Sequence, residues 1–370
     1  MKILHVIDKS FVGGGQTNVR NLLEGLRAIG TETELACRDG GPLVGWVRAL
    51  GVPVHPVPFD KRFRPGPARA VARLVRERGI DLVHGHGLVA TFYVMLAKRL
   101  GMPRVPVVYQ QHGFHHRNYG RATVGLRKAA ERWVCRQAER VIASSSQDEA
   151  ELLAGGYADP ARVLVLHNGI PEPVPTPAEA EQVRRALSPV LGKPGPIVGT
   201  IARLHVQKGI DTFLRAAVRV AEAVPDARFV VVGTGEIEAE MHALARTLPL
   251  GDRVLFTGSL PSRACHPHFD VVVMASRWEG LPIVLLEYMA CRKAIVTTRV
   301  AGCLEAVGPE EAEIVAVDDE DAISAAVVGL LRDRDLARRR GEAARRRFEA
   351  GFTLAGIARD YARLYQEVLA

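Results

Sequence analysis

The chain has 370 residues, which is more than one hydrophobic core usually holds, so we expect two domains. Its 48% hydrophobic and 24% charged residues are typical of a globular protein, and its apolar runs are shorter than the roughly 20 residues of a membrane-spanning helix. The net charge of +8 is uneven, since residues 1–170 hold 24 basic and 14 acidic side chains and residues 171–370 hold 25 and 27.

The basic first half favours an anionic partner. Nucleic acid is disfavoured, because no recognised nucleic-acid module is visible and aromatic residues make up only 6% of the chain. An anionic lipid surface or an acidic acceptor fits better, and a solvated basic surface without a partner is the alternative.

The segment Met1–Ile7 is too short for the core of a signal peptide, so we expect a cytoplasmic protein. The five cysteines are scattered, odd in number and without metal-ligand spacing. They predict reduced thiols rather than disulfides or a metal site.

Short apolar strands alternate with helical segments along the first half, which predicts a parallel sheet covered by helices on both faces. Helices are expected at Thr17–Ile29 and Pro67–Arg78. The expected strands are Lys2–Ile7, Thr33–Cys37, Val52–Val57, Leu82–His84, Val105–Gln110, Arg140–Ser144 and Val163–Leu166.

Four prolines between Pro171 and Pro177 predict an extended linker, which we place at residues 171–196. A second alternation follows. Its expected elements are the strand Ile197–Ala202, the helix Ile210–Val224, and then Arg228–Val232, Glu236–Thr247, Arg253–Thr257, Val271–Met274, a helix from about Pro282, Ala294–Thr297 and Ile314–Val317. The fold class is therefore α/β, with doubly wound domains at residues 1–170 and 197–351. Ligands of such domains bind at the carboxyl ends of the strands, where the strand order reverses.

Gly13, Gly14 and Gly15 follow the first strand and precede a helix that we expect to open near Thr17. Such a turn lets the backbone approach a phosphate and leaves N–H groups free to bind it. It is not the dinucleotide-binding fingerprint, because Asn18 occupies the position of the last glycine. A tight turn without a ligand is the alternative.

Two further segments of the first half are candidates for metal binding and for membrane binding. His112 follows a strand and precedes His115 and His116, but three such histidines without a nearby carboxylate are a weak metal motif. The segment Arg121–Arg140 repeats basic side chains at helical spacing around Trp133, which suits peripheral binding to an anionic membrane surface. A helix packed through Trp133 with a solvated basic face is the alternative.

In the second half, Arg203 ends a predicted strand and Lys208 precedes a helix, so the pair can neutralise a diphosphate. Glu279 and Glu287 are eight positions apart, and Gly280 and Pro282 place the first in a loop and the second inside a helix. The helix start offers free N–H groups to a phosphate, and each carboxylate can accept hydroxyl hydrogen bonds.

The pattern Glu279-Gly280, six residues and Glu287, together with Arg203 and Lys208, resembles the signature of the retaining glycosyltransferases of family 4. The resemblance spans nearly the whole chain and implies the GT-B fold, two Rossmann-like domains facing across a cleft. It also implies that the last helix, near 352–370, packs back on the N-terminal domain.

The resemblance assigns roles to residues as well. Glu279 would bind sugar hydroxyls, Glu287 the ribose, Arg203 and Lys208 the leaving diphosphate, and His112 the reacting sugar. The catalytic set is then His112, Arg203, Lys208 and Glu279. The remaining donor-binding residues are Gly14, Gly15, Gly233, Gly235, Phe256, Gly280, Leu281, Pro282, Ile283 and Glu287.

The implied function is transfer of a sugar, with retention, from a nucleoside-diphosphate donor to a hydroxyl of a glycan or lipid-linked acceptor. The expected nucleotide is uridine diphosphate, and no metal or other cofactor is expected. The protein would act in cell-surface polysaccharide or glycolipid synthesis, in the cytoplasm or on the inner face of the membrane. A sugar phosphorylase or epimerase of the same fold and a non-catalytic nucleotide-sugar-binding protein are the alternatives.

Overall fold

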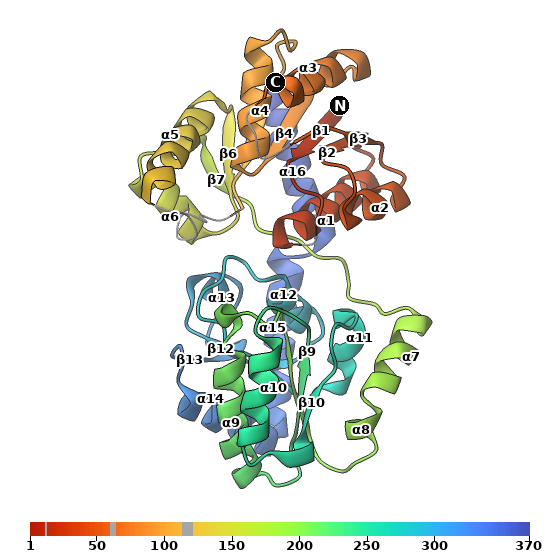
Figure 1. Ribbon diagram of the computed structural model, residues 1–370, viewed down its shortest axis with the longest axis vertical. Helices are drawn as coiled ribbons and strands as arrows, with labels where there is room; N and C mark the ends of the chain where they lie inside the picture. Colours follow the sequence, from red (N-terminus) through yellow and green to blue (C-terminus); the bar gives the residue numbers. More distant parts are fainter. Residues whose placement is uncertain (12, 60–63, 113–120) are drawn as a thin grey trace. The chain divides into compact units, whose positions relative to one another are not determined.

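The computed structural model describes residues 1–11, 13–59, 64–112 and 121–370 (Figure 1). It divides into two compact units. The N-terminal unit comprises Met1–Pro171 and Phe352–Ala370, and the C-terminal unit comprises Glu172–Gly351. Each unit is built on one parallel sheet.

The N-terminal unit contains a seven-stranded sheet in the order β3-β2-β1-β4-β5-β6-β7. Its strands are rich in valine, leucine and isoleucine and are buried by helices on both faces, as is usual for parallel sheets. The strands are β1 Lys2–Ile7, β2 Glu32–Cys37, β3 Val54–Pro56, β4 Leu82–His86, β5 Val107–Gln110, β6 Arg140–Ala143 and β7 Val163–Val165. The helices are α1 Gly14–Ala28, α2 Pro42–Ala49, α3 Gly66–Arg78, α4 Leu88–Arg99, α5 Arg121–Gln137, α6 Ser146–Ala154 and α16 Leu354–Leu369.

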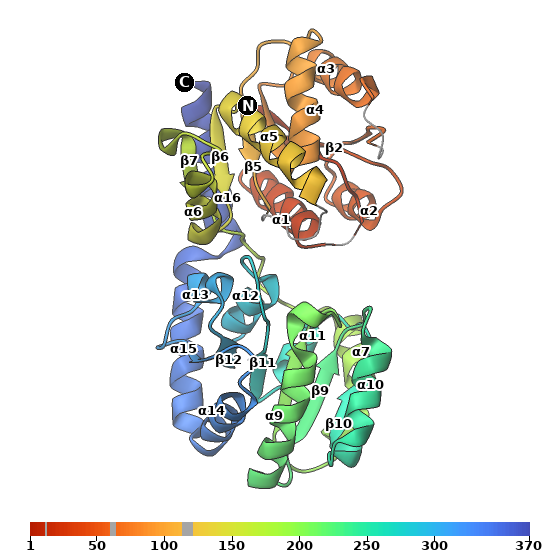
Figure 2. The ribbon, with the colours of Figure 1, turned by 60° about the vertical axis from the view of Figure 1, so that its left-hand side comes forward.

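The last helix, α16, lies against the N-terminal sheet beside α1 (Figure 2). Its buried side chains, among them Ile357, Tyr361 and Tyr365, share a hydrophobic cluster with Leu22 of α1 and Ile3 of β1. The two helices approach closely, since a Cβ built on Gly25 would lie 2.9 Å from the Cβ of Ala358. The end of the chain is thus part of the core of the first unit.

The C-terminal unit contains a six-stranded sheet in the order β10-β9-β8-β11-β12-β13. Its strands are β8 Ile197–Ile201, β9 Arg228–Val232, β10 Val254–Phe256, β11 Val271–Met274, β12 Ala294–Thr298 and β13 Ala312–Val315. Its helices are α7 Pro177–Ala186, α8 Ser188–Leu191, α9 Ile210–Ala223, α10 Glu238–Thr247, α11 Ser262–Cys265, α12 Ile283–Ala290, α13 Ala301–Ala306, α14 Glu320–Arg332 and α15 Arg334–Gly351, with a 3-10 turn η3 at Val206–Lys208.

In both units the strand order reverses at one point, between β1 and β4 in the first and between β8 and β11 in the second. Doubly wound sheets bind ligands at such points, outside the carboxyl ends of the strands. The loops that follow β1, β4, β8 and β11 are therefore where a functional site is expected in each unit.

The expected linker at residues 171–196 is wrong for most of its length, because helices α7 and α8 occupy it and belong to the C-terminal unit. Thr176 caps α7 in a capping box with Glu179, and Pro177 fits the first turn of a helix, where its missing N–H costs nothing. Arg263 of α11 binds the Glu179 carboxylate at 2.7 and 2.9 Å and holds α7 on the unit.

Several element limits also differ from the expectation. Strand β5 begins at Val107 rather than Val105, because Pro106 has no N–H for the sheet. The basic helix α5 ends at Gln137, and Arg140 begins β6. Helix α1 begins at Gly14 rather than near Thr17, so Gly14 and Gly15 are its first residues.

Candidate functional site

Lys208 and Glu279 form the centre of the candidate site in the C-terminal unit. Lys208 ends the turn η3 after β8, and Glu279 lies in the loop between β11 and α12. The Lys208 Nζ is 2.5 Å from Glu279 Oε1, and the two side chains are 19% and 7% exposed. Parallel strands β8 and β11 are neighbours, which brings the two loops together across 71 residues of sequence.

Two further groups hold the Glu279 carboxylate. The Ser276 hydroxyl donates a hydrogen bond to Oε1 at 2.7 Å, and the Gln207 amide donates to Oε2 at 3.4 Å. Gln207 also donates to the carbonyl of Trp278 at 2.7 Å. The carboxylate is thus fixed in position by one cation and two neutral donors.

Arg203 lies after β8 and is 58% exposed. Its Nη1 is 3.4 Å from Glu236 Oε1, at the far end of the Gly233–Glu236 turn. Arg203 and Lys208 therefore both emerge from the loop that follows the central strand, the first exposed and the second largely buried.

Arg277 anchors the loop that carries Lys208 through hydrogen bonds to Val206 and Gln207. The sequence alone did not indicate this role. The Arg277 guanidinium donates to the Val206 carbonyl at 2.6 Å, to Asp211 at 2.8 Å and to Asp318 at 3.0 Å. Its backbone N–H donates to the Gln207 carbonyl at 2.7 Å. Burial raises the pKa of Asp211, but the hydrogen bond and charge of Arg277 outweigh burial and hold that pKa below its ordinary value.

Glu287 lies inside α12, as expected, and has its own set of partners. The Ser262 hydroxyl donates to its Oε1 at 3.0 Å, and His266 Nε2 lies 3.4 Å from its Oε2. His266 is fully buried, whereas the Glu287 side chain is 19% exposed. Neither Ser262 nor His266 belongs to a motif near Glu287, so the sequence alone could not indicate them.

The start of α12 offers backbone groups beside Glu279. Pro282 is its N-cap residue, and among the described residues no side chain caps the helix by a hydrogen bond. The loop residues Gly280 and Leu281 are held by α13, since a Cβ built on Gly302 would lie 1.3 Å from the Gly280 carbonyl oxygen. Leu281 and Ile283 contribute backbone N–H groups on either side of Pro282, at the start of the helix.

Gly233 and Gly235 are required by close packing against the Arg203 loop. A Cβ on Gly233 would lie 1.9 Å from the Ala202 carbonyl oxygen, and one on Gly235 would lie 2.2 Å from that of Leu204. Gly233 also has a φ of 133°, which disfavours other residues. Phe256 ends β10 and packs against His242, with ring centroids 4.2 Å apart.

In the N-terminal unit, His112 lies beside Gly15, whereas a Cβ built on Gly14 would meet nothing within 4 Å. A Cβ built on Gly15 would lie 3.6 Å from the His112 ring, so the start of α1 and the loop after β5 are in contact. His112 Nε2 lies 3.2 Å from Nδ1 of His86, which ends β4. His115 and His116 lie outside the described residues.

Three buried histidines close to this point were not singled out from the sequence. They are His5, His84 and His86, which lie on β1 and β4. The spacing of His84 and His86, two apart on a strand, placed them on one face, but their proximity to His5 depends on strand pairing.

The basic helix α5 is packed through Trp133, which contacts Phe92 at 5.1 Å between ring centroids and carries Arg99 over its face at 5.5 Å. Leu126, Lys128, Arg132 and Arg136 are exposed. Trp133 therefore serves the core of the unit rather than its surface. Within the described residues, no helix has the length and apolar character to cross a membrane.

Comparison with known proteins gives the family. A model described as Glycosyltransferase Family 4 matches residues 12–172, and one described as Glycosyl transferases group 1 matches residues 184–347. The lipopolysaccharide core biosynthesis mannosyltransferase LpcC of Rhizobium leguminosarum bv. viciae is 30% identical over 249 residues, or 64% of this chain and 67% of that protein. The UDP-Gal:alpha-D-GlcNAc-diphosphoundecaprenol alpha-1,3-galactosyltransferase of Escherichia coli is 26% identical over 355 residues, or 91% and 89%.

Among solved structures, Anabaena HepE in complex with UDP-glucose is similar, with a TM-score of 0.84 and 20% identity over 99% of this chain and 100% of that one. Such a likeness establishes the fold, which is GT-B, with one Rossmann-like parallel sheet in each unit. The two family models and the 30% identity to LpcC show that the chain belongs to family 4 of the glycosyltransferases.

Proposed function

We propose that this glycosyltransferase transfers a sugar from a UDP-sugar to a hydroxyl of a glycan or lipid-linked acceptor, with retention of the anomeric configuration. The observation that carries the proposal is the Lys208–Glu279 pair, held beside the uncapped start of α12 at the point where the strand order reverses. Cation, carboxylate and free N–H groups then lie together, as a sugar diphosphate requires.

The donor would be bound through its three parts. Arg203 and Lys208 would neutralise the diphosphate, which gains negative charge as the bond to the sugar carbon breaks. Glu279 would accept hydrogen bonds from sugar hydroxyls. Glu287, which accepts a hydrogen bond from Ser262 and lies 3.4 Å from His266, would accept hydrogen bonds from the ribose hydroxyls.

The acceptor oxygen would attack on the face that the diphosphate leaves, and a phosphate oxygen would take its proton. His112 and the glycines Gly14 and Gly15 belong to the N-terminal unit, and we propose that they also take part in substrate binding. We propose that transfer needs no metal, because two cationic side chains carry the charge that a metal would otherwise balance.

The names of two similar proteins support this choice of donor and acceptor. The E. coli relative is named for a UDP-sugar donor and a diphosphoundecaprenol acceptor, and the HepE structure contains UDP-glucose. We propose that the enzyme acts on a lipid-linked acceptor at the inner face of the membrane. The exposed face of α5, with Leu126, Lys128 and Arg132, is the surface that we propose for this contact.

Two experiments test the proposal. Purified enzyme is screened with nucleoside-diphosphate sugars for thermal stabilisation, and binding donors are then incubated with lipid diphosphate-linked sugar acceptors. NMR of the product reports the anomeric configuration, and an inverted product contradicts the mechanism. Phosphate-dependent release of sugar without an acceptor would instead indicate a phosphorylase, and binding without turnover would indicate a binding protein.

Co-sedimentation with vesicles tests the membrane contact separately. Anionic vesicles should retain the enzyme at low salt and release it at high salt, whereas neutral vesicles should not retain it. Retention that does not depend on lipid charge contradicts a role for α5. Replacing Lys128 and Arg132 by glutamine should weaken the retention.

A further inference from the structure

His5, His84 and His86 lie on the same face of two paired strands. His5 of β1 is opposite His84 of β4 in the parallel register, and His86 is two residues further along β4. Successive side chains of a strand alternate between faces, so all three point toward the side covered by α16. Each ring is at most 1% exposed.

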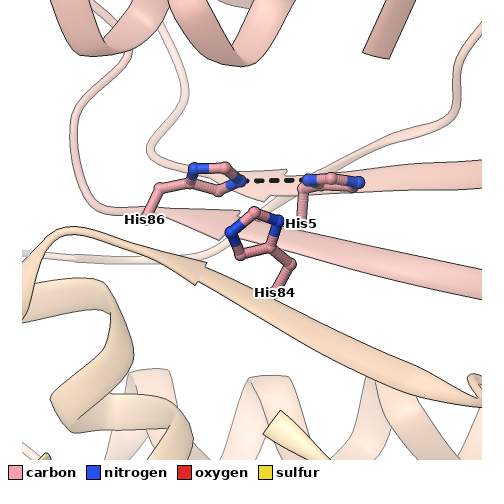
Figure 3. Close-up of side chains that lie close together, drawn as sticks. All are labelled: His5, His84 and His86. Atoms are coloured by element: carbon pink, nitrogen blue, oxygen red, sulfur yellow. Dashed lines mark hydrogen bonds between the residues drawn. The ribbon is translucent and has the colours of Figure 1, made fainter. Parts of the chain in front are cut away.

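The three rings lie close enough together for one metal ion to contact all of them. One ring nitrogen from each histidine lies within 4.8 Å of a ring nitrogen of the other two. Figure 3 shows the nitrogens of the His84 ring turned toward the pair that His5 and His86 form. That pair is 3.0 Å apart, from His5 Nδ1 to His86 Nε2.

Hydrogen bonds among the described residues do not satisfy this group. The Nε2 atoms of His5 and His84 are both buried without a hydrogen-bond partner in the described part of the chain. Buried polar atoms are nearly always paired, so the unpaired Nε2 of His84 calls for a ligand that accepts its lone pair, whereas His5 would bind the same ligand through Nδ1.

In His84 and His86 the ring nitrogen Nδ1 contacts a neighbouring side chain, as the second ring nitrogen of a metal-binding histidine usually does. The Tyr365 hydroxyl of α16 lies 2.7 Å from His84 Nδ1, and His112 Nε2 lies 3.2 Å from His86 Nδ1. Such outer contacts fix the orientation of a ring and leave its other nitrogen for a metal. His86 therefore presents Nε2 to the interior of the cluster.

Burial keeps these rings neutral and so keeps their lone pairs available. It lowers the pKa of His5 to about 3, and it lowers the pKa of His84 and His86 well below the ordinary value, with the neighbouring histidines adding to the effect.

We propose that His5, His84 and His86 form a binding site for one zinc ion that stabilises the N-terminal unit. Three imidazoles with no thiolate or carboxylate suit zinc. Two nitrogens bonded to tetrahedral zinc at about 2.0–2.1 Å are about 3.3 Å apart, so the pair at 3.0 Å needs to open by only a few tenths of an ångström. The ion would join β1 to β4 and, through Tyr365, to α16. The proposed ligand His86 contacts His112, but the ion takes no part in sugar transfer, which we propose to be metal-free.

The first test uses the full-length enzyme without a histidine tag, expressed with zinc in the medium and passed over a chelating resin. We expect about one zinc per chain by elemental analysis, and a melting temperature that falls after removal of the metal and rises again with added zinc but not magnesium. Zinc well below one per chain, with no effect of added zinc on the melting temperature, contradicts the site.

Cobalt identifies the ligands, because Co²⁺ takes the place of zinc and has visible bands that depend on geometry and donor atoms. We expect the intense bands of tetrahedral Co²⁺ without the near-ultraviolet thiolate band that cysteine ligands would produce. A thiolate band would place the metal at the cysteines and overturn the assignment.

Two variants locate the metal. His84→Phe and His5→Phe keep a ring of similar size in the core, so each should fold, as circular dichroism can verify, yet lose the cobalt spectrum and the response to zinc. The matched control is His268→Gln in the C-terminal unit, which should bind cobalt like the wild type. Cobalt spectra that persist unchanged in both phenylalanine variants contradict the proposal, whatever their transferase activity.

Discussion

The ammonium of Lys208 and the carboxylate of Glu279 form an ion pair in which the carboxylate is almost completely buried. The family resemblance suggested separate roles for them. Lys208 would bind the diphosphate, and Glu279 would accept hydrogen bonds from the sugar hydroxyls. In the structure the two side chains bind each other, so a diphosphate that approaches Lys208 competes with the Glu279 carboxylate for the positive charge of the lysine. Donor binding is therefore expected to loosen this pair and to release Glu279 oxygens for sugar hydroxyls.

Glu279→Gln should slow sugar transfer by about 10²–10³-fold, the range found when a single transition-state contact is removed. Glutamine keeps the size of the side chain and its acceptor oxygen, and the diphosphate should still bind to Lys208. Steady-state rates and calorimetric titration with the nucleoside diphosphate measure the two effects. The control is Glu238→Gln at the exposed start of α10, which should change neither. Loss of nucleotide binding in Glu279→Gln would show that the residue is structural.

Arg277→Lys should weaken nucleotide binding although Arg277 is not a proposed ligand. Lysine cannot span Val206, Asp211 and Asp318 at once, and the loop that carries Lys208 then loses its anchor. A hydrogen bond to a charged group contributes about 1.5–3 kcal/mol, so the unfolding free energy should fall by a similar amount. Denaturant unfolding and nucleotide titration check this. An unchanged affinity in a destabilised variant would show that Arg277 does not position Lys208.

Gly302→Ala should disrupt the loop that holds Glu279 and Gly280. The added Cβ would lie 1.3 Å from the Gly280 carbonyl oxygen and 2.8 Å from that of Glu279, so the backbone must move. Overpacking of this kind typically costs about 1–3 kcal/mol. Thermal unfolding measures the loss, and donor titration should show weaker binding.

Gly329→Ala is the matched control for Gly302→Ala. Gly329 lies in α14, and a Cβ built there meets nothing within 4 Å. Alanine in a helix interior is favoured over glycine by roughly 0.5–1 kcal/mol, so this variant should be more stable than the wild type. If both substitutions change the stability in the same direction, the close approach at Gly302 does not explain the effect of Gly302→Ala on stability.

Glu131 should make the stability of the enzyme depend on pH. Burial raises its pKa to about 7, although the Tyr109 hydroxyl and Arg127 act to lower it. The unfolded carboxyl has a pKa near 4.5, so between these values the folded chain binds the extra proton. The contribution of Glu131 is then most favourable at low pH and declines as pH rises from about 4.5 to 7, by at most about 1.4 kcal/mol per unit.

Glu131→Gln should remove this decline. Glutamine still accepts the Tyr109 hydrogen bond but carries no charge, so the variant should gain stability over the wild type at pH 8 and match it near pH 4. Chemical denaturation at a series of pH values gives both curves. Parallel curves for the two proteins would mean that Glu131 does not titrate in this range.

The sequence predicted the second unit well because its site is built from short motifs at strand ends. Arg203, Lys208 and Glu279 follow the neighbouring strands β8 and β11, and parallel strands deliver such residues to one edge. The helix from Pro282 and the position of Glu287 inside it also follow from local signals. The proposed roles of these residues stay predictions.

Contacts between residues that lie far apart in the sequence were not predictable. Arg277 binds Asp211 and Asp318, which are 66 and 41 residues away in sequence. The His5 and His84 contact depends on the register between β1 and β4. The error at residues 177–191 has a different cause, since the prolines suggested a linker although Thr176 and Glu179 already formed a capping signal.

The most direct test of the proposed function is calorimetric titration of the wild type and of Arg203→Ala with UDP and with uridine. Arg203 is exposed and bonded only weakly to Glu236, so its removal should leave the fold intact. We expect UDP to bind the wild type far more tightly than uridine, and Arg203→Ala to lose at least about tenfold in UDP affinity with no change for uridine. UDP that binds no better than uridine, or equally well to both proteins, would contradict the assignment of Arg203 and Lys208 to the donor diphosphate.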